Sequence, residues 1–88
     1  MNYTVLWVHE AEQELATLWM NEAERAAVAE AANEIDQRLR SNPDREGESR
    51  PHGHRVLFVA PLAVTFEVRP TDRVVQVLDV WKYERRTP

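Results

Sequence analysis

The spacing of apolar residues changes along the chain, and each spacing predicts a different element. From Tyr3 to Val8, β-branched and aromatic side chains lie on both faces of an alternating pattern, which is typical of a short, largely covered strand. From Glu10 onward the spacing becomes helical, with apolar residues at Ala11, Leu15, Leu18 and Trp19. The first region therefore predicts a strand, followed by a helix that runs to about Met20.

A second helix is expected directly after the first. Asn21 can cap its N-terminus, with Glu24 three residues further on in the manner of a capping box. One stripe of its surface is apolar and consists of Val28, Ala32, Ile35 and Leu39. The sequence Asn42-Pro43 ends this helix, because a residue that precedes proline is pushed out of the helical region. The two helices are thus predicted to form a hairpin with a very short turn.

Three strands are predicted in the C-terminal half, after an exposed polar loop over residues 44–53. They cover His54 to Ala60, Ala63 to Arg69, and Arg73 to about Tyr83, and the last is apolar on both faces, which predicts a central strand. The resulting order is β-α-α-β-β-β. It describes an α+β fold with an N-terminal strand, a two-helix hairpin and a three-stranded antiparallel meander. We expect both helices to pack on one face of the sheet and to leave the other face partly open.

Length and composition limit the class of protein. A chain of 88 residues is enough for one modest core, so a single domain over residues 1–88 is expected. Its longest apolar runs fall far short of the roughly 18 residues that a membrane span needs, so no membrane partner is expected. The N-terminus lacks a basic region and a small-residue cleavage site, which predicts a cytoplasmic protein. The absence of cysteine excludes disulfides and thiolate metal sites.

Charge is distributed unevenly between the two halves. Residues 1–46 contain ten acidic and four basic residues, a net charge of −6, whereas residues 47–88 contain five acidic and seven basic residues, a net charge of +2. The overall net charge of −4 argues against a protein that coats nucleic acid in general. An anionic partner is therefore expected to approach the C-terminal half.

The densest group of functional side chains consists of Arg50, His52, His54 and Arg55. A neutral imidazole can act as a base while guanidinium groups hold a phosphodiester, so this group is a candidate phosphate site. The alternative interpretation is an exposed loop whose polar side chains are solvated, with His54 opening a strand. His52 and His54 lack a third ligand at a telling spacing, so no metal site is predicted.

A second group, at the end of the last predicted strand, consists of Lys82, Tyr83, Arg85 and Arg86. Its cations can hold phosphate groups while Tyr83 stacks on a base or donates a proton. Arg85 is included as a phosphate-binding candidate, although a charged, solubilising end of the chain is the simpler interpretation for both arginines. Trp81 is either part of the core or an exposed aromatic residue in a binding groove.

The order and lengths of several segments are informative together. They are YTVLWVHEAEQELATLW, an alanine-rich second helix that ends in LRSNP, the lone arginine of ESRP, then HRVLFV, AVTFEV and VVQVLDVWKYERR. In this arrangement, which covers nearly the whole chain, the sequence resembles the RelE/ParE superfamily of toxins from bacterial type II toxin–antitoxin modules. The resemblance implies the fold predicted above and a function in growth inhibition.

For the ribosome-dependent nucleases of this superfamily, the resemblance implies cleavage of mRNA on the ribosome without a metal or another cofactor. The ribose 2′-hydroxyl attacks the neighbouring phosphate, which requires a base, an acid for the leaving 5′-oxygen and cations that stabilise the developing charge. The catalytic positions carried over to this chain are His54, Arg55, Lys82 and Tyr83. Two further positions where a basic residue is expected fall on Leu57 and at or near Ala63.

A missing donor to the developing charge costs on the order of 100- to 1000-fold in rate, so other modes of action stay open. Toxins with a similar fold poison DNA gyrase without that catalytic set, and a non-catalytic antitoxin-binding module is a further alternative. In every case the resemblance implies a cognate antitoxin, which lies across the helices and the sheet by strand addition and helix-in-groove contacts. The ribosome with its mRNA, or DNA gyrase, is the further partner implied. The acidic helices favour an antitoxin that brings basic residues and hydrophobic anchors.

Overall fold

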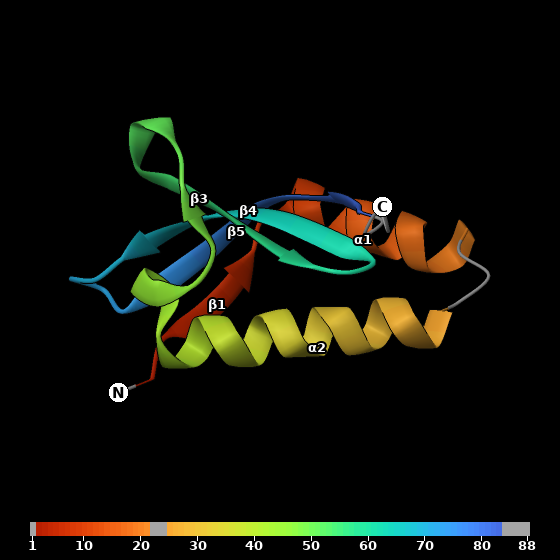
Figure 1. Ribbon diagram of the computed structural model, residues 1–88, viewed down its shortest axis with the longest axis horizontal. Helices are drawn as coiled ribbons and strands as arrows, with labels where there is room; N and C mark the ends of the chain where they lie inside the picture. Colours follow the sequence, from red (N-terminus) through yellow and green to blue (C-terminus); the bar gives the residue numbers. More distant parts are fainter. Residues whose placement is uncertain (1, 22–24, 84–88) are drawn as a thin grey trace, which may run out of the picture.

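The computed structural model describes residues 2–21 and 25–83, in which the chain forms two helices and five strands (Figure 1). Strand β1 (Thr4–Trp7) leads into helix α1 (His9–Asn21), and helix α2 (Arg25–Ser41) follows. Two short 3-10 turns, Pro43–Arg45 and Pro51–Gly53, flank the two-residue strand β2 (Glu48–Ser49). The chain then forms β3 (His54–Val59), β4 (Leu62–Arg69) and β5 (Val74–Lys82). The predicted order of elements is confirmed, and β2 is an addition within the predicted loop.

The strands form one mixed sheet in the order β1-β5-β4-β3-β2. Strands β3, β4 and β5 pair antiparallel as the predicted meander, and β1 pairs parallel with β5, with Val5 opposite Val75. A parallel neighbour requires a long crossover, which the two helices provide. Because β5 lies between β1 and β4, it is an interior strand, although β4 is the middle strand of the five.

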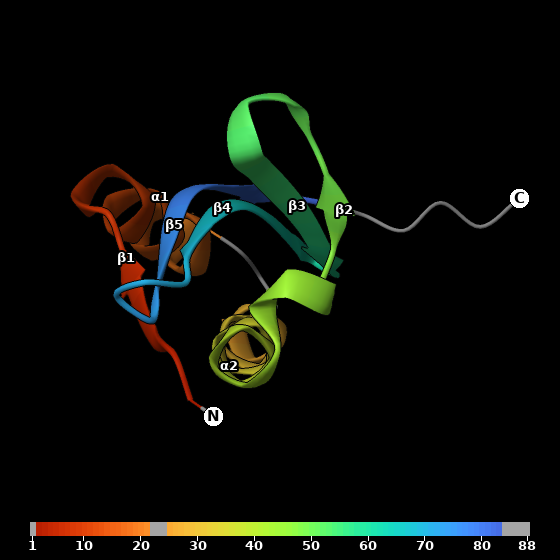
Figure 2. The same cartoon turned by 90° about the vertical axis from the view of Figure 1, so that its left-hand side faces the viewer.

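Both helices contribute to one apolar core on a single face of the sheet. Figure 2 looks nearly along the axis of α2 and shows the sheet arching over it. Ala11 of α1 and four residues of α2 (Val28, Ala31, Ile35 and Leu39) are buried against the strands. The predicted stripe on α2 is therefore confirmed, except that Ala31 is buried and Ala32 is only half-buried. Phe66 of β4 is fully buried, and such a side chain contributes roughly 1.5–3 kcal/mol through apolar burial alone.

The boundary between the helices differs from the prediction. Asn21 is the last residue of α1 and not the N-cap of the second helix, which the structure describes from Arg25. Asparagine is also favourable at the C-terminal end of a helix, so the residue type alone does not distinguish the two positions. Glu24, the other half of the predicted capping box, lies outside the described residues.

The segment between α2 and β3 is held by ionic contacts and by one glycine. Arg38 of α2 pairs with Glu46 (Nη2 to Oε1, 2.6 Å), and hydrogen bonding to Glu46 raises the pKa of Arg38 above its ordinary value. Gly47 has a φ of +70°, and a side chain there would collide with the carbonyl oxygen of Val56. The predicted exposed loop is therefore held in one conformation, in which β2 pairs with the start of β3.

Within the described ranges, no helix is long and apolar enough to cross a membrane.

Candidate functional site

Two surfaces carry candidate functional groups, and the first is the sheet face that the helices leave uncovered. Side chains alternate along each strand, and residues paired across an antiparallel ladder share a face. His54 pairs with Glu67, and Phe58 pairs with Ala63, which in turn pairs with Trp81. We call this surface the open face, and its members on β3, β4 and β5 include His54, Val56, Phe58, Ala63, Thr65, Glu67, Gln76, Asp79 and Trp81.

One end of the open face is polar and internally paired. His54 Nε2 lies 3.7 Å from Glu67 Oε2, and the other oxygen of Glu67 accepts a hydrogen bond from Arg69 Nε at 3.0 Å. The backbone amide of Arg50 donates to the carbonyl oxygen of His54, which places Arg50 opposite His54 and on the same face. Arg50 Nη1 lies 3.5 Å from a carboxylate oxygen of Glu48. Each arginine at this end therefore has an acidic neighbour, which reduces the attraction for an anion.

The other end of the open face is aromatic. The rings of Phe58 and Tyr83 pack with centroids 4.8 Å apart and planes tilted by 48°. Ala63 lies between Phe58 and Trp81 in the ladder and is completely buried, although it faces away from the main core. Trp81 was expected to be either a core residue or an exposed aromatic residue. It is half-buried, so each expectation holds in part. The aromatic end is thus a small second apolar cluster.

The structure does not gather the four residues predicted as catalytic. His54 and Arg55 are consecutive on β3, so they point to opposite faces of the sheet. Arg55 donates from Nε to the carbonyl oxygen of Glu46 at 2.9 Å and from Nη2 to that of Gly47 at 3.2 Å, and it thereby fastens the preceding loop. Tyr83 packs on Phe58, four residues along β3 from His54, which is about 13 Å at the rise of a strand.

The remaining predicted residues lie apart from these. Lys82 is exposed and pairs in the ladder with Leu62, whose side chain belongs to the main core. His52 is exposed at a φ of 65° in the turn before β3, and Arg85 lies outside the described residues. The described part of the chain contains no group of three or more histidine, cysteine or acidic residues that could hold a metal ion. Glu67 and Arg69, which contact His54 directly or through one residue, were not predicted as site residues.

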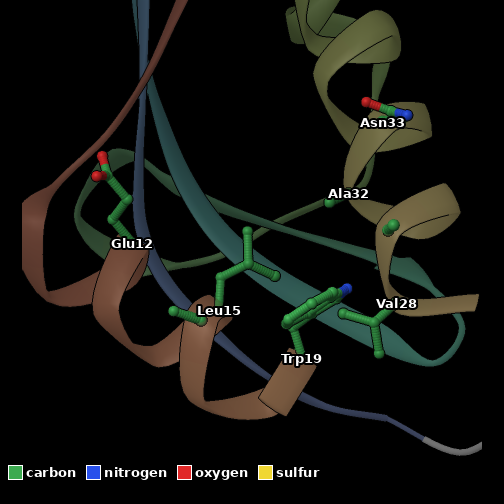
Figure 3. Close-up of a pocket in the computed structure, with 8 residues that line it drawn as sticks. Glu12, Leu15, Trp19, Val28, Ala32 and Asn33 are labelled. Carbon is green, nitrogen blue, oxygen red and sulfur yellow. The ribbon is translucent and has the colours of Figure 1, made fainter. Parts of the chain in front are cut away.

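The second surface is a groove beside the helix hairpin (Figure 3). It consists of two adjoining cavities, of about 380 and 420 Å³. The first lies between α1 and α2 and is lined by Glu12, Leu15, Ala16, Trp19, Val28, Ala29, Ala32 and Asn33. The second extends toward β1 and adds Val5, Leu6, Trp7 and Asp36 to four of these residues. We call this surface the hairpin groove.

The hairpin groove exists because small residues face each other across the two helices. Ala16 of α1 and Ala29 and Ala32 of α2 leave space that larger side chains would fill. The indole of Trp19 is 43% exposed, and the guanidinium of Arg25 lies 4.9 Å from its ring centroid. The alanines of α2 therefore have two roles: Ala29 and Ala32 line the open groove, and Ala31 packs closely in the core.

Comparison with known proteins identifies the fold. No known family model and no curated protein matches the sequence. Among solved structures, the toxin–antitoxin complex RelBE2 from Mycobacterium tuberculosis has a chain with 19% identity and a TM-score of 0.77, over 93% of this chain and 92% of that one. A chain of the chromosomal ParDE system from P. aeruginosa has 17% identity and a TM-score of 0.66, over 93% and 97% of the two chains. The chain has the RelE/ParE toxin fold.

An archaeal member of the same fold also matches. A chain of the RelE–RelB complex from Pyrococcus horikoshii has 17% identity and a TM-score of 0.68, over 98% of this chain and all of that one. The RelE/ParE fold therefore accounts for nearly the full length of the chain, and the expectation from the sequence segments is confirmed at the level of fold.

Within this RelE/ParE fold, both positions where a cation is missing are apolar packing positions. Leu57 is 3% exposed and belongs to the main core beneath the helices. Ala63 is completely buried between the cross-strand neighbours Phe58 and Trp81. A charged side chain at Leu57 would have to be buried in the core without a partner, which costs several kcal/mol. The surrounding residues thus fit the apolar side chains that are present.

Proposed function

We propose that this chain is the toxin of a type II toxin–antitoxin module and that a cognate antitoxin neutralises it. The observation that carries the proposal is the match to the RelBE2 toxin–antitoxin complex, with a TM-score of 0.77 over 93% of the chain. The matches to the ParDE toxin–antitoxin system and to the archaeal RelE–RelB complex add support, because both structures come from modules of the same kind.

The antitoxin is proposed to use the hairpin groove together with a sheet edge. The groove is an open apolar surface of the kind that receives an amphipathic helix. Strand β1 is an edge strand of the described sheet, and its residues Val5 and Trp7 line the second cavity of the groove. An extended segment that adds to β1 can therefore continue into a helix that occupies the groove.

Between the modes of action, the open face favours inhibition by protein binding, as in gyrase poisoning, over cleavage of mRNA. The reason is chemical: Ala63 supplies no donor for a developing negative charge, and Arg50 and Arg69 have acidic neighbours. His54 is the predicted catalytic residue that lies on the polar end of this face, so it is the base that we propose if cleavage occurs. A non-catalytic antitoxin-binding module is the remaining alternative, and Ala63 is the observation that favours it.

Expression in a bacterial host tests the toxin assignment. The chain is expressed alone, with a stop codon at an early position as the control, and together with the product of the adjacent reading frame. We expect the chain alone to stop growth, and we expect co-expression to restore growth and to yield a complex that purifies as one species. Normal growth combined with the absence of a complex would remove the proposal.

The mode of action is tested with the purified chain in vitro. We expect intact transcripts in translating extracts and inhibited supercoiling by purified gyrase. If transcripts are instead cut, His54→Ala should reduce the cutting, and Gln76→Ala on the same face serves as the control. Arrested growth with cut transcripts would contradict our preference for protein binding, whereas the toxin assignment itself would stand.

A further inference from the structure

The centre of the hairpin groove carries polar groups over an apolar floor, and apart from Asp36 its two ends are largely apolar. Four residues line both cavities and therefore mark the centre: Leu15 and Ala32 form an apolar floor, and Glu12 and Asn33 contribute polar groups from α1 and α2 respectively. Figure 3 shows Glu12, Leu15 and Trp19 following one another along α1, with Asn33 on α2 at the opposite side of the groove. A segment that enters the groove must pass Glu12 and Asn33.

Glu12 differs from Asp36, the other charged residue that lines the groove, in having no side-chain partner among the described residues. Asp36 is paired with Arg40, at 2.7 Å between Oδ2 and Nε. The ring of Trp19 is covered by the guanidinium of Arg25. No hydrogen bond or ion pair to any described residue involves the carboxylate of Glu12, and the side chain is exposed to solvent. Glu12 is therefore the place in the groove where a further cation can bind.

An apolar segment that covered the groove would remove water from the Glu12 carboxylate. Desolvation of an unpaired charge is strongly unfavourable, so a partner without a cation at this point binds more weakly. A partner that brings a cation replaces the lost hydration by an ion pair in a partly desolvated site, where such a pair is stronger than on an open surface. The same surface thus both admits one class of partner and rejects another.

Arginine fits this position better than lysine. Its planar group carries five N–H donors in a fixed geometry, and two of them can bind both oxygens of the Glu12 carboxylate at once. Its aliphatic stem can lie on Leu15 and Ala32. Lysine offers a single compact charge and does not bind both carboxylate oxygens in this fixed geometry.

We propose that the segment bound in the hairpin groove is an amphipathic helix with a central arginine paired with Glu12 and an apolar residue on either side. One apolar residue packs near Trp19 and Val28, and the other packs near Val5 and Trp7. From Glu12 to Trp19, α1 rises about 10 Å, which matches two turns of a partner helix. This proposal names the chemistry of the antitoxin segment, and it rests on the proposed function only for the identity of that partner.

The first experiment uses the complex with the product of the adjacent reading frame. Glu12→Gln removes the charge and keeps the shape, and Glu14→Gln, an exposed glutamate of α1 that does not line the groove, is the control. We expect Glu12→Gln to weaken binding about tenfold or more and to reduce its dependence on salt, while Glu14→Gln stays within about twofold. Equal binding by Glu12→Gln and the wild type overturns the inference and leaves the proposed function intact.

The second experiment does not require the antitoxin. The probe is a labelled helical peptide with a central arginine and one leucine two turns away on either side of it, and its twin carries norleucine in place of the arginine. We expect the arginine peptide to bind the wild-type chain about tenfold more tightly than its twin, and we expect the difference to disappear in Glu12→Gln. Tighter binding by the norleucine twin, or no binding by either peptide, overturns the inference whatever the adjacent reading frame encodes.

Discussion

The hairpin groove and the open face lie on the same small domain, but their polar groups are arranged in opposite ways. On the open face, Glu67 binds Arg69 and lies beside His54, and Arg50 lies near Glu48. In the hairpin groove, Glu12 has no partner among the described residues and lies over an apolar floor. The groove therefore offers a charged group that a partner can pair with, whereas these charged groups of the open face are already paired with one another.

This difference shows why the number of functional side chains is a poor guide to a site. The polar end of the open face has more residue types associated with catalysis than the groove has. Its charges nevertheless cancel locally, and its histidine lies about 13 Å along β3 from the tyrosine at the aromatic end. The groove offers one carboxylate, one amide and open apolar surface, which together suit a protein partner.

The largest expected effect comes from the core that both surfaces share. Phe66→Ala should lower the free energy of unfolding by about 3–5 kcal/mol, because it leaves a cavity beneath β4. Such a loss is a large part of the total stability of a small domain, so partner binding and toxicity should both decline. Chemical denaturation of the purified chain measures the effect. Phe58→Ala, on the more exposed aromatic end, is the matched control and should cost less than half as much.

The next effect should separate the two surfaces. Trp19→Ala removes an exposed aromatic side chain of the groove, and we expect binding of the antitoxin to weaken by about 2 kcal/mol, or about 30-fold. Phe58→Ala should leave the same affinity nearly unchanged, because it lies on the open face. Titration calorimetry of each variant provides the measurement. If Phe58→Ala weakens binding more than Trp19→Ala, the antitoxin covers the open face and the comparison is wrong.

The smallest effect distinguishes two neighbouring residues on β3. Arg55→Ala should reduce the free energy of unfolding by about 1 kcal/mol, because the carbonyl oxygens of Glu46 and Gly47 lose their donor. His54→Ala should change stability by no more than about 0.5 kcal/mol. Thermal unfolding of both variants measures the difference. A larger loss from His54→Ala would show that the pair with Glu67 holds the sheet together, contrary to our interpretation of the open face.

Much of the fold could be predicted because it follows from local patterns. The strand Ala63 to Arg69 was expected to turn Val64, Phe66 and Val68 inward, and the first two are completely buried while Val68 packs against the core. Asn42-Pro43 was expected to end the second helix, which ends at Ser41. The parallel pairing of β1 with β5 and the two-residue strand β2 depend on contacts between distant segments, and no local pattern encodes them.

The candidate site was harder to predict, and His54 and Arg55 show why. Their proximity in sequence suggested one phosphate site, but strand alternation places them on opposite faces. The same rule, together with the register of an antiparallel hairpin, would have placed Glu67 opposite His54 and Arg69 beside Glu67. The unpaired carboxylate of Glu12 was not recognisable, because the described parts of the two helices contain five similar glutamates and only tertiary structure shows which one lines a groove.

Ala63 also limits how chains of this sequence can change over time. An arginine at this position needs space that Phe58 and Trp81 now fill, and a smaller residue at either neighbour, introduced first, would leave a void over the alanine methyl group. Each single substitution is therefore unfavourable in the background of the other residue. We therefore expect a cationic centre at this end of the sheet to require coordinated substitutions at Ala63 and at one of its aromatic neighbours.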